Sequence, residues 1–124
     1  RKSTMPIFDI DRTLSPNSPV LKTMEVIRER TLSSPSIQKI LSNDSISGHD
    51  LASVRLELAL TVEVVAGITK IRPEYLTAIE EDRYNDLPSK LLLKGFLKSY
   101  LQCMGINPDT IAERYLKRID GNER

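Results

Sequence analysis

The sequence predicts an all-α protein, on the basis of three observations. Apolar residues recur every three or four positions along most of the chain, which is the spacing of one helical face. Residues that begin and end helices follow one another at short intervals. Hydrophobic residues make up 40% of the 124 residues, but aromatic residues make up only 5% and tryptophan is absent, so leucine, isoleucine and valine must form the core. This composition fits a modest helical bundle.

The N-terminal part of the chain predicts a partly helical extension. Residues 1–19 are expected to be irregular, because prolines interrupt them repeatedly. A short helix is expected over residues 20–30, since Val20, Met24 and Ile27 are spaced to share one face.

A domain boundary is predicted near residue 48. Residues 37–41 could form another turn or two of helix, and the polar stretch 42–48 is typical of a hinge-like linker. We therefore expect an N-terminal extension and linker over residues 1–48 and a helical domain over residues 49–120.

Five helices with short connections are predicted in that domain. Candidate residues for their first turns, in chain order, are Asp50, Thr61, Pro73, Ser89 and Asn107. Gly105 is expected in a left-handed conformation after the fourth helix. The positions predicted to face the core are Leu51, Val54, Leu58, Val64, Val65, Ile68, Leu76, Ile79, Leu93, Leu97, Tyr100, Met104, Ile111, Tyr115 and Ile119.

The second and third predicted helices have the spacing of a helix-turn-helix unit. Ala66 is small where the two helices should approach closely, and Ile71 is apolar in the turn between them. Such a unit commonly lays its second helix in the major groove of DNA.

The outward positions of this second helix are poorly suited to reading bases. We expect Pro73, Glu74, Thr77 and Ala78 to face outward, and only Arg72 supplies a basic side chain nearby. The net charge of +1, from 18 basic and 17 acidic residues, gives no bulk basic excess for binding phosphates. A DNA-binding transcriptional regulator that uses Arg72, Glu74 and Thr77 is therefore the alternative hypothesis.

The sequence predicts no catalytic site, no cofactor, no metal site and no small-molecule substrate. His49 is the only histidine and lies in the predicted linker, while Cys103 lies among apolar residues of the fourth helix. A metal site would require several histidine, cysteine or carboxylate ligands that converge. We interpret the acidic run 80–82 as an exposed helix end.

The fourth helix is the best candidate for a binding surface. Its apolar residues cover an arc of about 180°, whereas a single core-facing stripe needs little more than about 100°. Leu92, Phe96 and Cys103 fall on one shoulder of this arc, and Lys94 and Lys98 lie on the opposite, polar side. In a partner complex, Leu92 and Phe96 would anchor the contact and the two lysines would steer it. Alternatively, the fifth helix or the extension covers the shoulder.

Residues 48–116 resemble the cytoplasmic helix-turn-helix domain of the RodZ family of bacterial cell-shape proteins. The most telling stretches are TKIRPEYLTAIEEDRYNDLP and LKGFLKSYLQCMGINPD. The resemblance implies a five-helix bundle of the lambda-repressor-like superfamily. It also implies a cytoplasmic location, with any membrane anchor in a segment outside this chain.

In the RodZ family this domain binds the actin-like filament protein MreB, through two aromatic positions four residues apart on the fourth helix. Those positions fall on Leu92 and Phe96, so the resemblance implies a non-enzymatic scaffolding module that docks an MreB-like partner. Leu92 departs from the aromatic pattern, Ala59 stands where relatives often have glycine, and the extension is not typical of the family. A working role for the extension, as a dimerisation or effector arm, is a third hypothesis.

Overall fold

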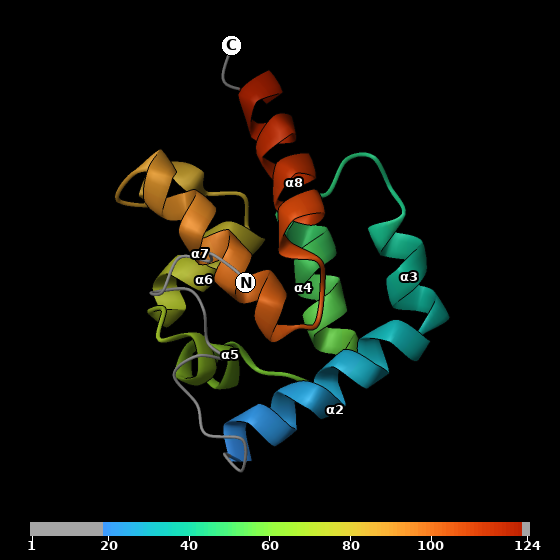
Figure 1. Ribbon diagram of the computed structural model, residues 1–124. Helices are drawn as coiled ribbons and strands as arrows, with labels where there is room; N and C mark the ends of the chain where they lie inside the picture. The colour runs from blue at the N-terminus through green and yellow to red at the C-terminus, as the bar shows by residue number, and fades with distance from the viewer. Residues whose placement is uncertain (1–18, 123–124) are drawn as a thin grey trace.

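A computed structural model of the chain describes residues 19–122, which fold into helices without any strand (Figure 1). The predicted all-α helix-turn-helix class is confirmed, and the five helices predicted for the domain correspond to α4 to α8. Most of the stretch predicted to be irregular, and the side chain of Val20, lie outside the described residues. The elements are α2 (Pro19–Ser33), α3 (Pro35–Leu41), α4 (Gly48–Glu57), α5 (Val62–Thr69), α6 (Pro73–Glu80), the 3-10 turn η2 (Tyr84–Asp86), α7 (Lys90–Cys103) and α8 (Pro108–Asn122).

Side-chain caps begin several of these helices. The hydroxyls of Thr61 and Ser89 accept hydrogen bonds from the third residues of α5 and α7, as predicted. The prediction for α4 was wrong, because Ser47 rather than Asp50 is its N-cap. The Ser47 hydroxyl accepts from the Asp50 amide and the Asp50 carboxylate accepts from the Ser47 amide, so the two residues form a reciprocal capping box.

The helices enclose one continuous core. In Figure 1, α4 lies between α3 and the pair formed by α7 and α8. α7 packs against α5, α6 and α8, while α4 packs against α3 and α6. The largest buried side chains in the described chain include Tyr100 and Tyr115, which stand among leucines and isoleucines from six helices.

The helix-turn-helix unit is formed by α5, a three-residue turn and α6. Lys70 ends α5 in the left-handed region at φ 63°, and Ile71 is buried in the turn. Two positions differ from prediction: Val64 is 44% exposed although it was expected to face the core, and Ala78 is buried although it was expected to face outward. Val65 and Ile68 pack on the core as predicted, so the covered face of α5 is narrower than its apolar pattern suggests, and α6 packs Ala78 against its neighbours.

The extension contributes to the core rather than standing apart from it. Ile27 of α2 and Ile37 of α3 belong to the same hydrophobic cluster as the helices of the domain. Ile46 is completely buried, although it lies in the stretch predicted to be a polar linker. The Thr31 hydroxyl, itself buried, donates a hydrogen bond of 2.7 Å to the carbonyl of Met104 at the end of α7. The boundary predicted at residues 48 and 49 thus falls within a shared core, at the first turn of α4.

The turn between α7 and α8 is shaped to receive α2. Gly105 has φ 71°, and a Cβ atom placed on it would lie 2.6 Å from the Cα atom of Arg28. Only glycine satisfies both the left-handed backbone and this close approach. On the other side of the extension, Arg114 of α8 donates to the carbonyls of Leu41 and Asn43 at 2.8 and 3.1 Å.

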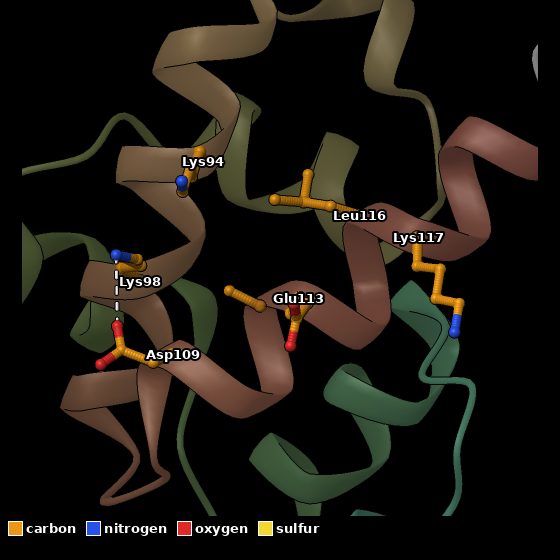
Figure 2. Close-up of a pocket in the computed structure, with 7 residues that line it drawn as sticks. Lys94, Lys98, Asp109, Glu113, Leu116 and Lys117 are labelled. Carbon is orange, nitrogen blue, oxygen red and sulfur yellow. Dashed lines mark ion pairs between the residues drawn. The ribbon is translucent and has the colours of Figure 1, made fainter.

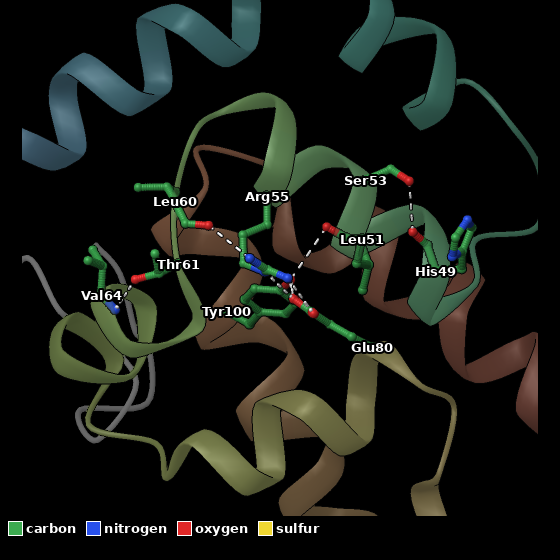
Figure 3. Close-up of polar contacts among 9 residues, drawn as sticks. All are labelled: His49, Leu51, Ser53, Arg55, Leu60, Thr61, Val64, Glu80 and Tyr100. Atoms are coloured by element: carbon green, nitrogen blue, oxygen red, sulfur yellow. Dashed lines mark hydrogen bonds and ion pairs between the residues drawn. The ribbon is translucent and has the colours of Figure 1, made fainter.

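A buried ion pair joins three helices of the domain (Figure 3). The Arg55 guanidinium donates from Nε and Nη2 to the two carboxylate oxygens of Glu80, at 2.7 and 3.0 Å. Its Nη1 donates to the carbonyl of Leu60 at 2.8 Å, and the Tyr100 hydroxyl donates to Glu80 Oε2. The hydrogen bond to Glu80 raises the pKa of Arg55, and burial together with the charge of Glu80 raises the pKa of Tyr100. Arg55 therefore stays charged, Tyr100 stays a donor, and the pair links α4, α6 and α7.

We expect Arg55→Met to lower the free energy of unfolding by about 3 kcal/mol, because it leaves the buried Glu80 carboxylate without its cation. Urea denaturation followed by circular dichroism would measure the loss. Arg83→Met is the matched control, since the ion pairs of Arg83 with Glu81 and Asp86 lie at the surface. The control should leave the midpoint almost unchanged, and an equal effect of the two substitutions would contradict the assignment.

Ala59→Gly should raise the free energy of unfolding by about 0.5–1 kcal/mol. Ala59 is exposed and has φ 59°, so glycine removes backbone strain there without losing buried surface. Ala52→Gly, within α4, is the control and should lower the same quantity by about 1 kcal/mol. Thermal unfolding of the two variants would reveal the opposite signs, and destabilisation by both would show that Ala59 is not strained.

Candidate functional site

α7 is covered by its neighbours on most of its surface. Leu93, Leu97 and Tyr100 face the core as predicted, and Leu101 is buried as well. Gly95 and Ser99, one turn apart, are also buried, and their small size suits a close approach of a neighbouring helix.

The beginning of α7 remains the most exposed apolar part of this helix. Leu91 is 80% exposed and Leu92 is 38% exposed, both in the first turn. The side chain of Phe96 is half-buried and its ring stacks on that of Tyr75 from α6, with centroids 5.4 Å apart. Cys103 is fully buried, so at this end of α7 the shoulder is covered, which is the alternative that the sequence left open. We call Leu92, Phe96 and the ring of Tyr75 the apolar surface of α7, whereas Leu91 lies on the side of the helix that carries the lysines.

The two lysines expected beside this surface face another helix. Lys94 and Lys98 line a groove of about 480 Å³ between α7 and α8, opposite Ala112 and Leu116 (Figure 2). Lys98 Nζ lies 3.2 Å from a carboxylate oxygen of Asp109 at the start of α8. Around α7, the lysines stand about 120–160° from Leu92 and Phe96. The four residues therefore do not form one patch, and the helix divides them between two flanks.

The positions expected to read DNA lie at the start of α6. Arg72, Pro73 and Glu74 are exposed, and Thr77 is half-buried. Arg72 Nη1 lies 4.0 Å from the Glu74 carboxylate, and both side chains are about two-thirds exposed or more. The only cation among these positions therefore has a carboxylate within reach of it, which lowers the attraction of this turn for phosphates.

The titratable residues that the sequence analysis considered are either exposed or held in contacts that stabilise the fold. His49 is exposed in the first turn of α4. The predicted exposed acidic run was wrong for two of its members: Glu80 is buried against Arg55, and Asp82 accepts from the Gly48 amide and pairs with Arg118 at 3.0 Å. Within residues 19–122, no three histidine, cysteine or carboxylate side chains are grouped so that they could hold a metal ion.

Two exposed or partly exposed apolar residues near the start of α7, Leu91 and Tyr75, were missed by sequence reasoning. Leu91 was overlooked because its position around the helix lies among those of the lysines, where a polar residue is expected. Tyr75 lies on a different helix, and only the tertiary fold brings its ring to Phe96. The position of Leu91 in the sequence could have indicated that it is exposed. It is the second residue after the Ser89 cap, so no earlier turn of α7 covers it.

Comparison with known proteins supports this architecture. A family described as "Helix-turn-helix domain" matches residues 50–111, which run from the first turn of α4 to the first turn of α8. The chain belongs to this helix-turn-helix family. The match includes the buried ion pair and the whole of α7, so both flanks of α7 belong to the helix-turn-helix domain, although Leu116 lies just beyond the matched range.

One relative of the helix-turn-helix domain is a protein from Bacillus subtilis (strain 168) named "Uncharacterized membrane protein YmfM". It is 33% identical over 60 residues, which is 48% of this chain and 21% of the relative. The chain thus spans about a fifth of the length of the relative that it matches. No solved structure matches the chain. Within residues 19–122, none of the helices combines the length and the apolar content that a membrane span requires.

Cys103 should react very slowly with a thiol reagent in the folded protein. Its side chain is buried, and burial raises the pKa of the thiol to about 12, so little thiolate forms at mildly alkaline pH. Absorbance of the released thiolate of Ellman's reagent would follow the reaction with and without urea. Rapid modification without urea would show that α7 opens readily or that Cys103 is reachable.

Proposed function

We propose that this helix-turn-helix domain is a non-enzymatic scaffolding module that docks a protein partner through the apolar surface of α7. The single observation that carries the proposal is the exposure of Leu92 beside the stacked rings of Phe96 and Tyr75, on a helix that buries most of its other apolar side chains. Clustered apolar exposure on a folded domain is typical of a partner site.

The aromatic pair on the apolar surface supports a specific contact with a partner rather than nonspecific hydrophobic exposure. Phe96 and Tyr75 stack nearly parallel, with 18° between their rings, so each ring limits the motion of the other. A preorganised aromatic pair loses little conformational entropy when a partner binds. Aromatic side chains of this kind are frequent among the residues that dominate binding energy.

The resemblance to the RodZ family supports an actin-like filament protein of the MreB type as the partner. In that family the contact uses two aromatic positions four apart, which fall on Leu92 and Phe96. Leu92 is not aromatic, but Tyr75 places a second ring beside Phe96 from the neighbouring helix. The chain could thus keep an aromatic pair on this surface, built from two helices instead of one. A cytoplasmic location of the module follows from the same proposal.

The α6 turn gives less support to the alternative, a DNA-binding regulator. Its exposed positions are a proline, an acid and one arginine, and Arg72 and Glu74 are near each other. Specific readout of bases usually requires side chains that donate to guanine or pair with adenine. Protein docking therefore explains the surface residues of the domain better than base recognition does.

Leu92→Glu should weaken binding to purified MreB filaments by about tenfold or more, because it places a charge within the apolar contact. Co-sedimentation of the full chain with the filaments would measure the affinity. Leu92 is a better target than Phe96, since Phe96 is half-buried against Tyr75 and its replacement could disturb the fold. Unchanged helical content by circular dichroism would establish that the variant is folded.

Leu32→Glu is the matched control, since Leu32 is 64% exposed on α2 and lies outside the apolar surface of α7. It should bind filaments as the natural chain does. Equal binding by the Leu92 variant, or failure of the natural chain to sediment with filaments, would contradict the proposal. Binding to random duplex DNA that falls steeply with salt and is lost in Arg72→Ala would favour the alternative.

A further inference from the structure

The groove between α7 and α8 is a second feature that could receive a ligand, on the other flank of α7 from the apolar surface. One wall carries the ammonium groups of Lys94 and Lys98, and the other presents the half-buried Leu116, with the buried Ala112 beneath it (Figure 2). Glu113 and Lys117 border the groove on α8, but Figure 2 shows their charged ends directed away from the lysines of α7.

The charges that face each other in the groove are unbalanced. Asp109 is the carboxylate that pairs with Lys98, while Lys94 forms no ion pair with any residue in the part of the chain that the structure describes. Asp109 has an 82% exposed side chain, so its bond to Lys98 is weak and can exchange with another carboxylate. The geometry of this pair also indicates where a foreign carboxylate could lie relative to Lys98.

We infer that this groove binds a protein segment in which an acidic side chain is adjacent to an apolar one. The carboxylate pairs with Lys94 and competes with Asp109 for Lys98, and the apolar side chain packs on the half-buried Leu116. The volume of about 480 Å³ accommodates side chains of this size, and the charge of the α7 wall selects acidic over basic segments. The inference extends the proposed function, because it gives the scaffold a second docking surface and names the chemistry that this surface recognises.

Selection of a random twelve-residue peptide library on the immobilised full chain would test the inference. The enriched peptides should contain aspartate or glutamate next to leucine, isoleucine or phenylalanine. Lys94→Glu should weaken binding of those peptides by about fivefold or more, since it replaces attraction with repulsion at an exposed site. Lys39→Glu makes the same change of charge on α3 and should leave binding unaffected.

A pair of neutralising substitutions on α8 separates groove binding from general electrostatics. Asp109→Asn removes the carboxylate that competes for Lys98 and should strengthen binding about threefold, whereas Glu113→Gln, which changes net charge equally, should have little effect. Peptides without acidic residues, binding that survives Lys94→Glu, or equal effects of the two α8 substitutions would overturn the inference. Leu92→Glu should not alter peptide binding, so failure of the groove and failure of the proposed function would be distinguished.

Discussion

The ion pair between Arg55 and Glu80 is the constraint on which the arrangement of the domain depends. Two charges that are removed from water must be fully paired, and here the remaining partners are the Tyr100 hydroxyl and the Leu60 carbonyl. Glu80 is the last residue of α6, where the helix dipole disfavours a negative charge, so the cation on α4 is especially needed. Because α4, α6 and α7 meet at this point, the position of α7 relative to α6 is fixed. The stacking of Phe96 on Tyr75 is a second contact between the same two helices, α6 and α7.

Much of the fold followed from local rules that act within one or two helical turns. The caps of α5 and α7 and the left-handed Gly105 depend on neighbouring backbone atoms, so Thr61, Ser89 and Gly105 could be identified from their spacing. The cap of α4 was misassigned because Ser47 and Asp50 bond to each other, and either residue alone would satisfy the pattern. Periodicity also failed for Val64 and Ala78, since the width of the covered face depends on which helices pack against it.

The candidate site was predicted less completely than the fold, for a similar reason. The wide arc of apolar residues on α7 correctly indicated that the bundle leaves part of the Leu92 side chain exposed. The partners of the α7 side chains come from other helices, however: Tyr75 from α6 and Asp109 from α8. No pattern along α7 contains that information. The burial of Glu80 was equally invisible, because a carboxylate in an acidic run gives no sign of the arginine that reaches it from α4.

The packing of α2 on the turn between α7 and α8 affects the order in which the segments of the chain can fold. Met104 accepts the bond from Thr31, and Gly105 admits the backbone of Arg28, only after α7 and α8 have formed the turn between them. α2 thus gains these contacts only after a turn that lies 73 residues further along the chain has formed. Contacts between such distant segments are slow to form, because the chain must close a long loop first. We therefore expect α2 to dock late, on helices whose α7–α8 turn has already formed.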